Sequence, residues 1–221
     1  DNLQFGLSIT QTNDGGMVGT GQDNGSGGSG SCDLYIYKVN ECGENQWYRR
    51  YGDSGTDAGL YVKQTKDNGY IVTGVTTSYG NGGNDIWFLR LDPQGNMIWS
   101  RTFGNGGDDH GRCVDEMPNG DFLISGHSNH KPVVIRIDKN GNLIFQKKLS
   151  LNSGIANYVE SFSDNSILIL GQYNGSIGGI DMFAVKLDVN GNLIWAKEMG
   201  GNGIDGYEYD VAGKIFNDNG F

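Results

Sequence analysis

The sequence predicts an all-β fold built from repeated four-stranded antiparallel sheets. A strand-turn-strand pattern begins at Phe5, Ala58, His110 and Ile155, so it recurs about every 45 to 53 residues, a spacing typical of β-propeller blades. A second hairpin follows each of these segments, over 33–51, 85–103, 131–149 and 181–199. Glycine makes up 38 of 221 residues and falls at fixed places in the repeat. Many tight turns explain this excess better than a flexible linker does.

The first hairpin of each copy turns at residues that tolerate a positive φ. These pairs are Asp14-Gly15, Asp67-Asn68, Asn119-Gly120 and Asp164-Asn165. The strand that follows ends in a glycine, at Gly21, Gly74, Gly126 and Gly171. The second hairpin turns at Asn40–Glu44, Asp92–Asn96, Asp138–Asn142 and Asp188–Asn192. A type I turn followed by a left-handed glycine joins antiparallel strands in this way.

Apolar residues occupy both faces of the third strand, as in Ile86, Trp87, Phe88 and Leu89. In a sheet that is covered on one side only, apolar and polar residues would alternate more regularly along the strand. We therefore expect blades that pack face to face. An aromatic residue recurs at one position of the fourth strand, and we interpret the set as packing between blades rather than as a ligand cage: Trp47, Trp99, Phe145 and Trp195.

One β-propeller region is therefore expected over 1–221. Its blades lie at about 1–52, 53–104, 105–150 and 151–200, and the first strand of a fifth lies within 201–221. Because radial repeats protect their edges by closing a ring, the intact protein is expected to continue to about six to eight blades, or to receive the rest from a partner. A two-sheet sandwich is the alternative fold, but it does not account for the fixed repeat.

Composition excludes several classes of function. Hydrophobic residues make up 36% and aromatic residues 11%, enough for a real core. The net charge is −10 and the 16 basic residues are spread along the chain, so no nucleic-acid partner is expected. No run approaches the ~20 apolar residues of a membrane helix. No signal peptide is visible, and the chain begins inside the repeat, as expected of a processed form or of part of something larger.

The three cysteines do not form a disulfide framework. Cys32 and Cys42 are separated by the expected strand 34–39, which is too long for a disulfide to bridge. Cys113 falls inside an expected strand and is interpreted as a small buried residue. None of the three stands in a CxxC or Cys/His spacing, so they support no metal site.

Function is expected on the face that carries the variable loops, as in other repeat proteins. The turns inside the hairpins lie on one face, and the loops between hairpins and between blades lie on the other. The latter are 22–31, 75–84, 127–130 and 172–180, with connections 53–57, 105–109 and 201–205.

Aromatic and histidine side chains in these loops are the candidate ligand-binding residues. Tyr79 and Tyr173 lie among small polar residues, with Asn24 and Asn81 nearby, and could stack on a sugar ring or anchor a protein. Loop packing is the alternative role of the two tyrosines. His127 and His130 follow Asp108, Asp109 and His110 of the preceding connection, which suggests a metal or general-base site. The spacing is not a recognised ligand set, so solvent-exposed loop histidines are the favoured interpretation.

Aspartates recur in the same region. Asp53, Asp57, Asp108, Asp109 and Asp205 are expected to form an acidic rim. Calcium uses such oxygens, and Asp53, Asp57 and Asp109 are its candidates, although no loop has the calcium-loop order. Asp33, Asp85 and Asp181 recur at the start of the third strand and are interpreted as caps of backbone N–H groups. Asn24-Gly25-Ser26 and Asn174-Gly175-Ser176 match a glycosylation acceptor.

The repeat resembles the β-propeller repeats of secreted bacterial proteins, especially surface and exported proteins of Bacteroidetes. The resemblance rests on DNGYIVTG, DIWFLRLDPQGNMIWSRTFGNGG and DMFAVKLDVNGNLIWAKEMGGNG, and it covers nearly the whole chain. Lys131-Pro132 departs from it, where other copies have an aspartate. The family implies secretion or a cell-surface location, often with adhesion modules and type IX secretion.

These observations predict a non-enzymatic extracellular binding or scaffold module of a larger protein. Its partner is a protein or a glycan on the loop face, together with further domains of the same polypeptide. A carbohydrate-binding propeller is the alternative, and an enzyme with a site in the central funnel is the third reading. No cofactor is expected, and bound calcium is left as an alternative.

Overall fold

The computed structural model describes residues 4–24, 32–151, 153–174 and 179–199. Within these ranges the chain contains sixteen strands in four antiparallel four-stranded sheets and no helix. This confirms the expected all-β fold of repeated four-stranded sheets. The strand expected within 201–221 lies outside the described residues, as does Asp205.

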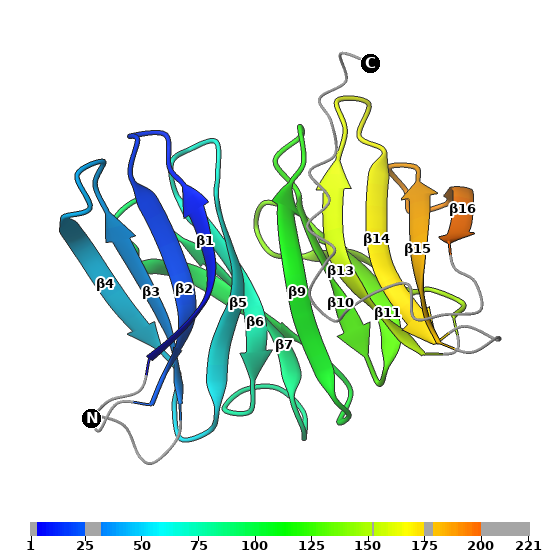
Figure 1. The fold of residues 1–221 in the computed structure, drawn as a ribbon, viewed down its shortest axis with the longest axis horizontal. Helices are drawn as coiled ribbons and strands as arrows, with labels where there is room; N and C mark the ends of the chain where they lie inside the picture. Colours follow the sequence, from blue (N-terminus) through cyan, green and yellow to red (C-terminus); the bar gives the residue numbers. More distant parts are fainter. Residues whose placement is uncertain (1–3, 25–31, 152, 175–178, 200–221) are drawn as a thin grey trace.

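Each sheet is formed by four strands that pair in the order of the sequence (Figure 1). Sheet 1 contains β1 (Gln4–Gln11), β2 (Met17–Asp23), β3 (Asp33–Val39) and β4 (Asn45–Tyr51). Sheet 2 contains β5 (Asp57–Gln64), β6 (Tyr70–Thr76), β7 (Asp85–Leu91) and β8 (Met97–Phe103). Sheet 3 contains β9 (Asp109–Glu116), β10 (Phe122–Ser128), β11 (Lys131–Ile137) and β12 (Leu143–Lys148). Sheet 4 contains β13 (Gly154–Ser161), β14 (Ile167–Asn174), β15 (Ile180–Leu187) and β16 (Leu193–Met199).

The turns have the conformation that their residues predict. Positive φ angles occur in the first hairpins at Gly15, Asn68, Gly120 and Asn165, and in the second hairpins at Gly43, Gly95, Gly141 and Gly191. The recurring glycine near the end of the second strand is required for a different reason, namely close contact with the neighbouring backbone. A Cβ on Gly74 would lie 1.8 Å from the Ala58 carbonyl oxygen, next to an irregularity in the β5–β6 register. Only a glycine allows this close approach of two backbones.

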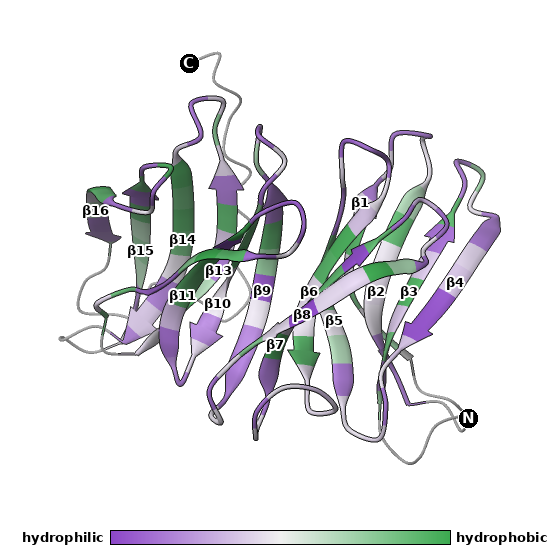
Figure 2. Cartoon of the chain, turned by 180° about the vertical axis from the view of Figure 1, so that it is seen from behind, coloured by the Kyte–Doolittle hydropathy of each residue, from purple (hydrophilic) through white to green (hydrophobic). Residues whose placement is uncertain are grey.

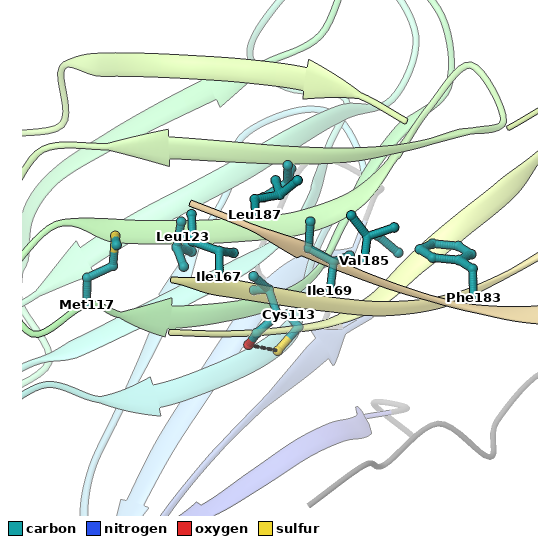
Figure 3. Packing of buried hydrophobic residues seen from close by; sticks show 11 residues of the cluster. Cys113, Met117, Leu123, Ile167, Ile169, Phe183, Val185 and Leu187 are labelled. Carbon is teal, nitrogen blue, oxygen red and sulfur yellow. Dashed lines mark hydrogen bonds between the residues drawn. The ribbon is translucent and has the colours of Figure 1, made fainter. Parts of the chain in front are cut away.

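The sheets stack so that hydrophobic cores lie between neighbours. Alternate residues of β7 serve two of these cores: Trp87, Leu89 and Leu91 pack toward sheet 1, whereas Ile86 and Phe88 pack toward sheet 3. A further core lies between sheets 3 and 4, and Figure 3 shows side chains of both sheets gathered in it. Hydrophilic residues dominate β4, whereas β14 and β15 are largely hydrophobic (Figure 2). The prediction of sheets packed on both faces is therefore confirmed for sheets 2 and 3.

The fourth strand of each of the first three sheets contacts a turn of the next sheet. The Trp99 ring stacks on Phe88 at 5.5 Å and lies 6.2 Å from Phe122 of the next sheet. Arg101 lies over the Trp99 ring and donates from Nε to the Gly141 carbonyl at 2.9 Å. Lys147 repeats this contact with the Gly191 carbonyl at 2.6 Å. The interpretation of the recurring aromatic residues as packing groups is confirmed for Trp47, Trp99 and Phe145, which pack against the three cores.

A buried cation on the third strand joins the two hairpins of each of the first three sheets. Lys38, Arg90 and Arg136 are each less than a tenth exposed. They pair with carboxylates in the first-hairpin turns, namely Asp14, Asp67 and Asp121. Lys38 also donates to the Gln46 side chain and to the Val39 carbonyl. These contacts satisfy a charge that would otherwise be costly to bury.

The outer faces of the terminal sheets are open. Ile9 of β1 is 58% exposed, whereas its counterpart Val62 of β5 is 1% exposed against sheet 1. Trp195 of β16 is 37% exposed and Met199 is also exposed. Both faces therefore present apolar side chains of the kind that a neighbouring sheet covers elsewhere in the structure.

The cysteines are free, which confirms that Cys32 and Cys42 do not pair, and Cys113 is buried as predicted. In the part of the chain that the structure describes, no helix is long and apolar enough to cross a membrane.

Replacing Trp99 by alanine tests the packing between sheets. The variant is expected to lose about 2–4 kcal/mol of unfolding free energy, since it removes an aromatic group from the core between sheets 2 and 3. Trp195→Ala is the matched control, because the same repeat position is more exposed there. Urea denaturation measures both, and an equal loss in the two variants would contradict this account.

Replacing Asp14 by asparagine tests the buried cation. The hydrogen bond from Lys38 lowers the pKa of the Asp14 carboxyl to about 2 from its ordinary value of 3.8. A lowered carboxyl pKa stabilises the fold above the ordinary value, and this stabilisation is lost as the pH falls from 3.8 toward 2. Because half of the Asp14 side chain is exposed, Asp14→Asn is expected to cost only about 1 kcal/mol at pH 7.

Urea denaturation at a series of pH values checks this expectation. The difference in stability between the parent and Asp14→Asn should shrink as the pH falls below 4. A difference that stays constant down to pH 2 would show that the charge pair is not its source.

Candidate functional site

The loops between hairpins and the connections between sheets gather at one end of the molecule. The N–H of Asp57 donates to the Cys32 carbonyl at 2.7 Å, and the N–H of Asp109 donates to the Asn84 carbonyl at 2.9 Å. The N–H of Gly154 likewise donates to the His130 carbonyl at 2.7 Å. Each connection is therefore fastened to the loop of the sheet before it.

The loop of sheet 3 differs from the others because it is only two residues long. Strand β10 runs to Ser128 and β11 begins at Lys131, so that Asn129 and His130 alone form the turn. Their φ angles are +49° and +62°. Two successive positive φ angles define a type I′ turn, which usually contains glycine. For other residues this conformation costs about 1–2 kcal/mol each.

Asn129 is held in the turn by hydrogen bonds to the connection 104–108. Its backbone N–H donates to the Asp108 carbonyl at 2.9 Å, and its side chain donates to Asn105 Oδ1 at 2.9 Å. The side-chain oxygen of Asn129 accepts a bond from the Asp108 N–H at 3.3 Å. The left-handed conformation of Asn129 is thus compensated locally.

All three histidines of the chain form one stack. His110 of β9 and His127 of β10 are cross-strand neighbours, with ring centroids 4.8 Å apart and an interplanar angle of 22°. The His130 ring lies 6.4 Å from the His127 ring at an angle of 8°. Hairpin pairing therefore brings together two residues that are 17 positions apart in the sequence.

Asp108 faces the inner part of this stack. His110 Nε2 lies 2.9 Å from Asp108 Oδ1, and His127 Nε2 lies 3.6 Å from Asp108 Oδ2. Asn84 of the preceding loop donates to Asp108 Oδ1 at 2.6 Å. The hydrogen bonds from Asn84 and His110 lower the pKa of Asp108 to about 2. Asp108 is therefore ionised at neutral pH.

His127 is a buried strand residue. It is 5% exposed, and its Nδ1 is buried without a hydrogen-bond partner. Burial, together with the nearby His110 and Arg112, lowers the pKa of His127 to about 4. The expectation of a solvent-exposed loop histidine is wrong for His127, because β10 continues one residue beyond it.

A cleft of about 200 Å³ lies beside the stack, between sheets 3 and 4. It brings together the candidate residues His127, His130 and Tyr173, and is completed by Ser153, Gly154, Ile155, Gln172, Asn174 and Ile180. Gln172 is 6% exposed, and its Oε1 is buried without a hydrogen-bond partner. Tyr173 donates its hydroxyl to Glu198 at 2.9 Å, which orients the ring.

The other candidates lie away from this cleft. Tyr79 packs on Trp87 at 5.3 Å and donates its hydroxyl to the Gly52 carbonyl, although 42% of the residue is exposed. The backbone N–H of Asn81 donates to Asp85 at 2.7 Å. Asn24 is exposed at the end of β2, and the rest of its glycosylation motif lies outside the described residues.

The acidic residues do not form the expected common rim. Asp53 is exposed, whereas Asp57 and Asp109 are completely buried at the starts of β5 and β9. Asp57 accepts a hydrogen bond from the Asp53 N–H at 3.1 Å, and Asp109 accepts one from the Asn105 N–H at 3.2 Å. The rim prediction is wrong for Asp57 and Asp109. Their buried carboxylates accept hydrogen bonds from the backbone of the preceding connection instead of facing solvent.

Asp109 lies near the second buried carboxylate Asp85, with Gly104 between them. The Oδ1 atoms of both residues are buried without a hydrogen-bond partner. Burial raises the pKa of Asp85, and the neighbouring Asp109 raises it further. The proximity of the two carboxylates disfavours the ionised form of Asp85. At the equivalent place in sheet 1, Asp33 has Arg50 as an ionic partner at 3.3 Å.

No family model and no curated protein matches this chain. Among solved structures it is similar to a protein of unknown function from Dyadobacter fermentans, with a TM-score of 0.59, 14% identity and coverage of 87% of this chain and 63% of that one. Sqt1 from Chaetomium thermophilum gives a TM-score of 0.49 at 11% identity, covering 85% of this chain and 44% of that one. A eukaryotic initiation factor gives 0.41 at 10% identity, covering 86% and 54%.

These similarities concern the fold alone. The first comparison supports an all-β arrangement of repeated four-stranded sheets. This chain spans less than two thirds of that similar structure.

Two glycine substitutions test the turn of sheet 3. His130→Gly is expected to stabilise the fold by up to about 1 kcal/mol, since glycine adopts a positive φ without steric cost. Asn129→Gly relieves the same conformational cost but removes two side-chain hydrogen bonds, so it is expected to destabilise the fold. Thermal denaturation distinguishes the two, and changes of the same sign would contradict the assigned role of Asn129.

Proposed function

We propose that the four sheets are consecutive blades of a β-propeller ring that extends beyond the described residues. The stacking order supports this, because β1, β5, β9 and β13 lie next to one another in succession. The apolar groups on the open faces of sheets 1 and 4, such as Ile9 and Trp195, are suited to further blades. Ring closure would also cover the exposed edges of the arrangement.

Within this ring the chain acts as a non-enzymatic binding or scaffold module of a larger secreted or cell-surface protein. The acidic composition and the resemblance of the repeat to secreted bacterial propellers support this role. The buried aspartates Asp57 and Asp109 accept hydrogen bonds from their own connections, which favours a structural role for them over a catalytic one.

The cleft between sheets 3 and 4 is the binding site in this proposal. The observation that carries it is the convergence of a tyrosine, two histidines and polar side chains from two sheets, with Gln172 Oε1 buried and unpaired in the wall. An unpaired buried acceptor is costly unless a ligand supplies a donor. A ligand with hydroxyl or amide groups would meet this need.

A neutral glycan is the second candidate ligand beside a protein segment. The Tyr173 ring offers an apolar surface for a sugar ring, and Gln172 and Asn174 offer hydrogen bonds to its hydroxyl groups. The net charge of −10 disfavours anionic glycans.

Glycan-array screening followed by calorimetry on the best neutral oligosaccharide tests the glycan assignment. Tyr173→Ala is expected to weaken binding by about tenfold, as loss of one aromatic stacking contact would. Tyr79→Ala is the matched control, because Tyr79 lies outside the cleft and should leave the affinity unchanged.

Equal losses in the two tyrosine variants would contradict the placement of the site. An array without any bound glycan would remove the glycan candidate. Crosslinking from a cysteine introduced at Asn174 to a partner protein would then test the protein candidate.

A further inference from the structure

Three side chains at the edge of sheet 3 have the composition of a transition-metal site. Asp108, His110 and His127 each offer one ligand atom, and these atoms lie within 4.8 Å of one another. The Nε2 atoms of both histidines face the same carboxylate, at 2.9 and 3.6 Å. Ligands about 2.0–2.2 Å from a tetrahedral Zn²⁺ are separated by roughly 3.4 Å. The two contacts to Asp108 lie near that value, and the 4.8 Å spread of the three ligand atoms requires the histidine rings to move closer together around an ion.

The contact between His127 and Asp108 also points to a ligand between them. His127 is 5% exposed, and its Nε2 is the ring nitrogen that faces the Asp108 carboxylate. The contact from its Nε2 to Asp108 is 3.6 Å, which is too long for a hydrogen bond. A buried polar ring without a hydrogen bond is costly. A metal ion between Nε2 and the carboxylate would turn the long contact into two coordination bonds.

The supporting contacts hold these ligands in place. His110 and His127 are fixed opposite each other by the β9–β10 register. Asn84 donates to the Asp108 carboxylate at 2.6 Å, and Asn129 accepts a bond from the Asp108 backbone. Such outer contacts orient the ligands in metal sites. Three separate elements thus converge on one point.

We propose that Asp108, His110 and His127 bind one divalent transition-metal ion of the Zn²⁺ class. Two imidazoles and one carboxylate suit Zn²⁺, Co²⁺, Ni²⁺ or Cu²⁺, whereas Ca²⁺ and Mg²⁺ prefer sets of oxygen ligands. The side chains of Asp108 and His110 are 43% and 22% exposed, so an ion can enter from solvent. Three protein ligands leave a coordination position for water or for an external group.

The metal site and the proposed ligand-binding cleft overlap at one residue only. His127 is shared with the cleft, but Asp108 and His110 do not line it. Metal binding can therefore be measured without knowing the ligand of the cleft. Failure of one proposal does not imply failure of the other.

Calorimetric titration of the chelator-stripped chain with Zn²⁺ tests the site, and Co²⁺ absorption reports the coordination geometry. One ion per chain is expected. His110→Gln and Asp108→Asn should each weaken Zn²⁺ binding by at least about 10–100-fold, because loss of a supporting contact alone has an effect of that size and a ligand contributes more. His130→Gln is the matched control, because His130 stacks on His127 without belonging to the set, and it should bind Zn²⁺ like the parent.

Absence of stoichiometric Zn²⁺ binding would overturn the proposal. So would equal affinities of His110→Gln and the parent, or stronger binding of Ca²⁺ than of Zn²⁺. Circular dichroism of each variant verifies that the sheets are intact. Because His110 is partly exposed, its variant remains informative even if Asp108→Asn fails to fold.

Discussion

The structure depends on the burial of the central strands of each sheet on both faces. Trp87 and Phe88 are adjacent in β7 but pack into different cores, one on each side of sheet 2. No isolated sheet could bury both, so each sheet is stable only when it has neighbours. The ties from the fourth strand to the next turn, as from Arg101 to Gly141, reinforce the same stacking. Exposed Ile9 and Trp195 are the consequence at the two ends of the stack.

Stacking also determines where function can reside. Because strands alternate in direction, the standardised hairpin turns occupy one end of every sheet, and in the first three sheets a buried cation such as Lys38 lies beside them. The variable loops and the connections collect at the other end, where backbone hydrogen bonds join them. In sheet 3 this end carries the two-residue turn at Asn129. A short turn leaves His127 close to the edge, where sheet 4 supplies Tyr173 to the same cleft.

The aspartates show how one residue type serves different purposes in one fold. Asp57 and Asp109 are buried and close their connections, whereas Asp108, only one residue from Asp109, faces histidines and is 43% exposed. Alternation along an extended chain separates the two neighbours onto opposite sides. The pattern of carboxylates in the sequence therefore could not distinguish a structural aspartate from a candidate ligand.

The sequence by itself determined the repeat, the four four-stranded sheets, the positive-φ turns at residues such as Asn68 and Gly95, and the packing role of Trp99. These features follow from local periodicity and turn chemistry, and both are present within each repeat of the sequence. Only the tertiary structure decided that His127 is buried, that His110 and Asp108 lie beside it, and that Tyr173 rather than Tyr79 borders the cleft. Those relations depend on strand register and on contacts between sheets, and a linear pattern specifies neither of them residue by residue.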